Sequence, residues 1–356
     1  MRHIVYISSI IFVFHFISCS SKSDVSAIGT YTDFPQEQEL KAKTILLDTA
    51  LFRYPFRLHI GNDKAVVLDL HGTDYFFHAF SYPDFHYLSS FGKRGDAPQD
   101  MLSAENIRWN GTFWWTLDAN KSELTRFEFA LSGDSLLRQE AVNLDKDILR
   151  ALDFVMCEDS TFIIPDYSGD NRFCRVDRNG KLMHKLGTIP SANEDALQNA
   201  RPALAQAWRS FIDYNPQNGV FAAVTQLGEV LEIYNLKDST HVVRIGPHGE
   251  PEFQVSEGYG IPTGIMGFSD VQVTDNAIYT VFHGRSFQEI ARNAQKGTNL
   301  DGGQYIYVFS LNGEPLKKYV LDHYVYGISV DEQRGVIYVT DVNRDEPILE
   351  YSIKDV

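Results

Sequence analysis

Four aspartates stand at the end of short apolar segments in this chain of 356 residues: Asp69, Asp118, Asp166 and Asp341. We expect each to close the second strand of a repeated unit, which would place all four on one face. Carboxylates arranged in a ring could bind calcium or magnesium, and Asp118, Asp166 and Asp341 are the candidates for such a metal site. The alternative is that the aspartate only caps the turn that follows it, and its recurrence in one register favours this. We therefore predict no cofactor, with a divalent cation as the open alternative.

A second group of candidates consists of cationic side chains in loops: Arg94, His248, His283 and Arg285. The chain has a net charge of −15, so these residues would be cationic points on an acidic protein. Arginine presents a planar fork of donors, which suits a carboxylate, a phosphate or an acidic polymer. The alternative is that these residues pair with neighbouring carboxylates such as Asp96, Glu250 and Glu289.

Motifs of common hydrolytic sites are absent, since the chain contains neither His-Glu-x-x-His nor Gly-x-Ser-x-Gly. Nothing in the sequence therefore marks a nucleophile or a zinc site, and we predict no catalytic residue. The excess of acidic residues also argues against nucleic acid as a partner.

The elements that must position these residues form an internal repeat. Its unit is an apolar strand, a tight turn, a second strand, often an aspartate, then a third strand and a second tight turn. First strands are expected near six positions: Leu58, Ile107, Leu152, Phe211, Val271 and Ile328. These positions are 45 to 60 residues apart. Repeated units of about this length with four short strands are typical of propeller blades. The sequence predicts an all-β fold, a six-bladed β-propeller.

The last unit of the repeat has three strands and lacks a fourth. Residues 42–47 precede the first full unit and belong to no blade of their own. We expect this N-terminal strand to pair with residues 347–353 and so complete the last blade. Such a pairing closes the ring and removes an exposed sheet edge.

Antiparallel strands divide the connections of each blade between two faces. One face receives short turns throughout, and the other receives four long loops: 92–106, 187–208, 246–267 and 283–303. Loops lengthen where they carry function, so we expect the binding site on the long-loop side. Two insertions are expected to be helical: Asn193–Trp208, broken at Pro202, and Ser286–Lys296, with Ser286 as its N-cap.

Two glycine-rich loops follow fourth strands: Phe91-Gly92-Lys93-Arg94-Gly95-Asp96-Ala97-Pro98 and Ile245-Gly246-Pro247-His248-Gly249-Glu250-Pro251-Glu252-Phe253. They resemble the interblade loop Gly-x-x-Gly-x-x-Pro of a known family, and the repeated units resemble NHL-type blades. Over residues 34–356 the chain is similar to the TolB-like six-bladed propeller lipoproteins of bacteria. This resemblance implies the fold and lipid anchoring, and it implies no particular ligand.

The N-terminus is typical of an export signal. Residues 4–17 are almost wholly apolar, and Ser18-Cys19 follows them in a pattern that resembles a bacterial lipobox. We predict a signal peptide over 1–18, a lipidated Cys19 with a tether over 19–33, and the propeller over 34–356. The alternative is an ordinary signal peptide with an incidental cysteine. Cys157 and Cys174 are expected to be unpaired, because strands two apart in a sheet exceed disulfide reach.

Together these features predict a lipid-anchored propeller of the cell envelope, in the outer membrane of a Gram-negative bacterium. The predicted function is that of a non-catalytic binding or scaffold module. Its partners would be the membrane, through the lipid, and an unknown envelope protein, peptide or glycan. The alternative is a metal-assisted hydrolase or lactonase with its site at the mouth of the central channel.

Overall fold

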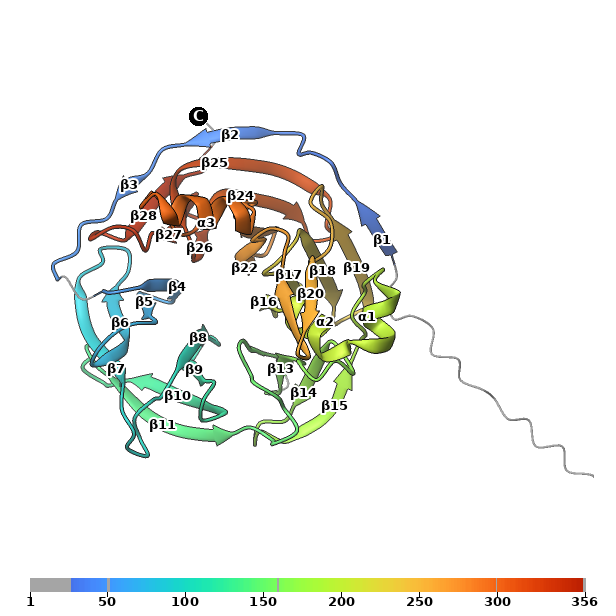
Figure 1. The fold of residues 1–356 in the computed structure, drawn as a ribbon. Helices are drawn as coiled ribbons and strands as arrows, with labels where there is room; N and C mark the ends of the chain where they lie inside the picture. The colour runs from blue at the N-terminus through green and yellow to red at the C-terminus, as the bar shows by residue number, and fades with distance from the viewer. Residues whose placement is uncertain (1–26, 50–51, 159, 299, 355–356) are drawn as a thin grey trace, which may run out of the picture.

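The computed structural model describes residues 27–49, 52–158, 160–298 and 300–354. These residues form six antiparallel sheets arranged as blades around a central axis (Figure 1), so the expected six-bladed propeller is confirmed. The predicted signal peptide over 1–18 and the predicted lipidation site Cys19 lie outside the described residues. No helix in the described ranges is long and apolar enough to cross a membrane.

The strands of blades 1 to 3 follow the chain in order from the axis outward. Blade 1 contains β4 (Pro55–Gly61), β5 (Lys64–Asp69), β6 (Tyr75–Ser81) and β7 (Tyr87–Lys93). Blade 2 contains β8 (Ala104–Trp109), β9 (Trp114–Asp118), β10 (Glu123–Phe129) and β11 (Leu136–Asn143). Blade 3 contains β12 (Val155–Met156), β13 (Phe162–Pro165), β14 (Phe173–Val176) and β15 (Leu182–Leu186).

Blades 4 to 6 repeat this order and carry the N-terminal segment on their outer edges. Blade 4 contains β16 (Ser210–Asn215), β17 (Val220–Thr225), β18 (Val230–Asn235) and β19 (Thr240–Ile245). Blade 5 contains β22 (Phe268–Val273), β23 (Ala277–Phe282), β24 (Gly303–Ser310) and β25 (Pro315–Val325). Blade 6 contains β26 (Ile328–Asp331), β27 (Val336–Thr340) and β28 (Ile348–Ser352).

The missing fourth strand of blade 6 comes from the N-terminus, as predicted. β3 (Lys43–Thr44) pairs antiparallel with β28, with Thr44 opposite Leu349, and the Ile45 amide donates to the Ile348 carbonyl at 2.9 Å. Antiparallel hydrogen bonding of this kind satisfies the outer edge of the last blade and joins the two ends of the ring.

The N-terminal segment continues as a belt around blades 4 and 5, which the sequence did not predict. β1 (Ala27–Thr30) pairs parallel with β19, and β2 (Glu37–Leu40) pairs parallel with β25. Figure 1 shows β1, β2 and β3 following one another along the outside of the ring. The described part of the chain is therefore already paired with the propeller at Ala27, ahead of the expected start at residue 34.

The core lies between neighbouring blades, because each sheet buries both of its faces against the next. Trp114 and Trp115 are adjacent on β9, so their side chains point to opposite sides of blade 2. Trp114 packs with Leu68 and Phe77 of blade 1, whereas Trp115 packs with Phe162 of blade 3. Both tryptophans thus serve the packing between blades. Cys157 and Cys174 are buried and form no disulfide with each other, as expected.

Strand polarity defines two faces. We call the side that receives the links between second and third strands, and between successive blades, the long-loop face; the opposite side is the short-turn face. Three insertions lie on the long-loop face (Figure 1): helices α1 (Glu194–Asn199) and α2 (Arg201–Ala207), the hairpin β20–β21 (Phe253–Ser256, Tyr259–Pro262), and helix α3 (Phe287–Gln295).

The predicted helical insertions form for the expected reasons. The first breaks at Ala200, and Pro202 lies in the first turn of α2, where a missing amide proton costs little. The second begins at Ser286, whose hydroxyl accepts a hydrogen bond from the Glu289 amide at 3.1 Å.

Candidate functional site

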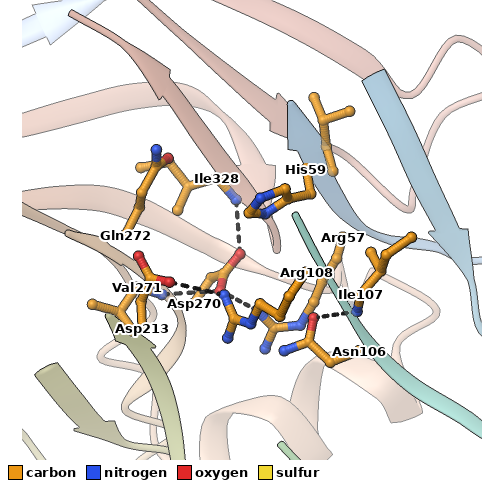
Figure 2. Close-up of a pocket in the computed structure, with 11 residues that line it drawn as sticks. Arg57, His59, Asn106, Ile107, Arg108, Asp213, Asp270, Val271, Gln272 and Ile328 are labelled. Atoms are coloured by element: carbon orange, nitrogen blue, oxygen red, sulfur yellow. Dashed lines mark hydrogen bonds and ion pairs between the residues drawn. The ribbon is translucent and has the colours of Figure 1, made fainter. Parts of the chain in front are cut away.

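The inner strands of the blades carry a buried ionic network that the sequence analysis missed (Figure 2). Arg57 on β4 forms an ion pair with Asp270 on β22, and both are 4% exposed. Arg108 on β8 reaches Asp153 and Asp213, each at 3.1 Å between nitrogen and carboxylate oxygen. A charge amid apolar neighbours on an inner strand, as in Ile107-Arg108-Trp109, was the available signal.

The three aspartates of this network also bind the inner strand of the following blade. In each pair the carboxylate accepts a backbone amide proton: Asp153 from Ile212 at 3.0 Å, Asp213 from Val273 at 2.8 Å, and Asp270 from Ile328 at 3.0 Å. Burial raises the pKa of Asp213 to about 6, although the charge of Arg108 opposes this shift.

The space left inside this network is too small for a ligand. The cavity between Arg57, Asn106 and Asp270 measures about 20 Å³, which is room for roughly one water molecule. Its charged groups already have partners across the ring. The network therefore holds the inner strands together and is not a binding site.

The structure does not gather the aspartates expected to bind a metal. Each carboxylate accepts hydrogen bonds from its own connecting loops; Asp118, for instance, accepts the amides of Leu102, Ser103, Asn120 and Lys121 at 2.7 to 3.3 Å. Asp166 pairs with Lys185 at 3.0 Å, and Asp341 lies 3.3 Å from His323. Within the described ranges no group of three or more His, Cys, Asp or Glu side chains could hold a metal ion. The geometry is that of turn-capping residues, as the alternative interpretation expected.

The four predicted cationic residues lie on the long-loop face but do not form one site. Arg94 donates to the Leu70 carbonyl at 3.0 Å and lies over the Phe76 ring. Arg285 donates to the Gly302 carbonyl at 2.8 Å and lies over the Tyr324 ring. These two guanidinium groups brace their own loops by hydrogen bonds and cation–π contacts.

The two histidines of that set are also engaged or buried. The Nδ1 atom of His248 is 2.6 Å from the carboxylate of the buried Glu229, so His248 pairs with a different acid from the expected Glu250. His283 is 4% exposed, and burial lowers its pKa to about 3. A histidine that is neutral at physiological pH provides no cationic point for an anion.

A cavity of about 460 Å³ does open on the long-loop face. Its walls come from the link between blades 2 and 3, the links inside blades 3 and 4, and the insertions that follow them. Apolar side chains line much of it: Leu149, Leu152, Leu227, Pro262, Met266 and Phe287. A smaller polar set completes the wall: Arg150, Tyr167, Gln206, Arg209 and Gln226. Small-molecule sites have this size and this mixture of apolar walls with few polar groups.

A second cavity, of about 550 Å³, opens on the short-turn face. Its rim is made of the tight turns at Asn110, Ser160 and Pro216. At its inner end, Arg108 and Asp213 pair with each other. The cation of this cavity is therefore neutralised by its own wall.

The comparisons with known proteins agree with this architecture. The family described as TolB-like 6-blade propeller-like matches residues 33–333. The chain belongs to this family. The expected resemblance is thereby confirmed, and the TolB-like match covers all six blades in part or in full. No curated protein matches the chain.

Solved structures resemble this TolB-like propeller over most of its length. A putative exported protein from Bacteroides fragilis is 12% identical, with a TM-score of 0.57, over 92% of this chain and 100% of its own. An auxiliary nutrient binding protein from Bacteroides ovatus is 11% identical, with a TM-score of 0.54, over 89% of this chain and 78% of its own. Identities this low show a shared fold and carry no site residues from one protein to another.

Proposed function

We propose that this protein is a lipid-anchored, non-catalytic binding module of the cell envelope whose ligand occupies the long-loop cavity. The observation that carries the proposal is the cavity itself, about 460 Å³ in volume and built by links from separate blades and by all three insertions of the long-loop face. Its wall offers guanidinium, amide, phenol and apolar groups, which suit recognition rather than bond cleavage.

The N-terminal sequence and the names of the similar proteins support this cellular setting. Ser18-Cys19 after an apolar run would give a diacylated cysteine, and the chain joins the ring only eight residues later, at Ala27. A tether of this length spans at most about 28 Å, so the propeller would stay close to the membrane surface. The names of the two Bacteroides proteins, exported and nutrient binding, favour an envelope location and a binding role.

The uncharged fluorescent probe N-phenyl-1-naphthylamine tests whether this cavity binds apolar molecules. The mature chain from residue 19, carrying Cys19→Ala so that no lipid competes, should bind the probe saturably at one site. Leu149 is 50% exposed at the cavity wall, so Leu149→Trp should fill the space and weaken binding about tenfold or more without unfolding the blade.

A matched control is Leu236→Trp, because Leu236 is 37% exposed in the turn that follows β18 on the short-turn face. This variant should bind the probe like the wild type. Binding that survives Leu149→Trp, or that is lost only in Leu236→Trp, would place the site elsewhere and contradict the proposal.

A further inference from the structure

We infer that the ligand of the long-loop cavity is an amphiphilic organic anion: a small molecule with one anionic headgroup on an apolar body. Arg150 and Arg209 would hold the headgroup. This inference rests on the proposed function, because it names the chemistry of the same cavity.

The first support is an excess of positive charge at the cavity wall. Arg209 has one carboxylate nearby, Glu105, at the long separation of 3.8 Å between nitrogen and oxygen. Among the described residues, no hydrogen bond or ion pair engages the guanidinium of Arg150. Burial raises the pKa of the Glu105 carboxyl, and the charges of both arginines oppose that rise, so all three groups share one neighbourhood. Two guanidinium groups beside one carboxylate carry a net positive charge, which one further anion would neutralise.

The second support is the apolar remainder of the wall. Leu149 is 50% exposed, and Leu227, Met266 and Phe287 complete an apolar lining. Covering such a surface is favourable in proportion to the apolar area removed from water. A purely ionic ligand would leave this apolar surface exposed to water, and a purely apolar ligand would leave the excess positive charge of the two arginines without a counter-charge. An amphiphilic anion satisfies both parts of the wall.

A pair of matched fluorescent probes tests the inference. 1-Anilinonaphthalene-8-sulfonate shares the apolar body of N-phenyl-1-naphthylamine and adds an anionic headgroup. The wild-type mature chain with Cys19→Ala should bind the sulfonate about tenfold tighter than the uncharged probe. Arg150→Gln and Arg209→Gln should each weaken the sulfonate about tenfold, because each removes a charged donor, and should leave the uncharged probe within about twofold.

Two further variants complete the design. Arg209→Lys keeps a charge and should retain part of the preference for the sulfonate, which separates a lost cation from a disturbed fold. Arg178→Gln changes an exposed arginine in the turn after β14, on the short-turn face, and should alter neither affinity.

Octanoate and octanamide then separate the natural headgroup chemistry from the dye. Octanoate should displace the sulfonate probe about tenfold better than octanamide does. Equal wild-type affinities for the two dyes, or equal losses of both in the arginine variants, would overturn the inference while leaving the proposed function intact. Failure of both dyes to bind the cavity would overturn the proposed function as well.

Discussion

The ionic network on the inner strands gives the most quantitative prediction. Arg108 joins three blades, because its guanidinium contacts Asp153, Asp213 and the carbonyls of Phe154 and Ile212. Arg108→Met removes this cation and leaves two carboxylates without it in the centre of the ring. Breaking a buried ion pair by removing one partner typically costs about 3–5 kcal/mol. We expect a loss of about 4 kcal/mol in the free energy of unfolding at pH 7.

The dependence of this loss on pH follows from Asp213. Its folded pKa of about 6 lies above the unfolded value of about 3.9, so the folded state holds the proton more tightly. Ionisation of Asp213 therefore lowers the free energy of unfolding as the pH rises through about 4 to 6. Lowering the pH from 7 to 5 should restore about 1 kcal/mol of this free energy in the wild type. Without Arg108 the pKa of Asp213 rises further, so acid should restore about 2 kcal/mol or more in the variant. The difference in the free energy of unfolding between Arg108→Met and the wild type should therefore be about 1–2 kcal/mol smaller at pH 5 than at pH 7.

Urea titrations followed by tryptophan fluorescence at pH 7 and pH 5 measure both quantities. Arg126→Met is the matched control, because Arg126 is half-buried and its ion pair with Glu140 is solvent-exposed; it should cost less than about 1 kcal/mol at either pH. The double variant Arg108→Met, Asp213→Asn should recover part of the loss at pH 7, since it removes one of the stranded carboxylates. A loss below about 1 kcal/mol in Arg108→Met, or a loss that grows at pH 5, would refute this account of the network.

Three further predictions concern the belt, the anchor and the aspartates. A chain that lacks residues 1–48 loses the pairings of β1, β2 and β3, and its melting temperature by circular dichroism should fall by about 10 °C or more; an unchanged value would count against the closure. Cys19→Ala should move the protein from the membrane fraction to the soluble fraction of disrupted cells, and continued sedimentation with membranes would argue against lipidation. Asp118→Ala strands four backbone amides and should cost about 2–4 kcal/mol, whereas neither calcium nor a chelator should shift the wild-type melting temperature; a calcium-dependent shift that this variant abolishes would restore the metal site.

The sequence was sufficient for the fold because a propeller repeats one local pattern. Each blade needs only short apolar strands and tight turns, and both are properties of neighbouring residues. The closing strand was predictable for the same reason, since three strands in the last unit leave one edge to cover. The belt strands β1 and β2 were not, because they are short and largely exposed and pair parallel with edges far away in the sequence. Such strands lack the alternating burial that marks a strand in a sequence.

The sequence also determined which loops lie on each face of the molecule. It did not determine which partners the side chains of those loops contact. Strand polarity alone places the four long loops on one side. Arg94 and Arg285 nevertheless donate to carbonyls of nearby loops, and His248 pairs with Glu229, because each side chain finds its partner only after the loops fold back.

Only the tertiary structure decided where a ligand can bind. Leu149, Tyr167, Arg209 and Leu227 stand on four separate links and are ordinary residues in their local sequence. They share one wall because successive blades rotate about a common axis and bring the starts of their inner strands together. A local sequence pattern indicates the direction of a strand and the residues that the strand buries. The convergence of distant loops depends on the curvature of the whole ring, which no single segment of the sequence encodes.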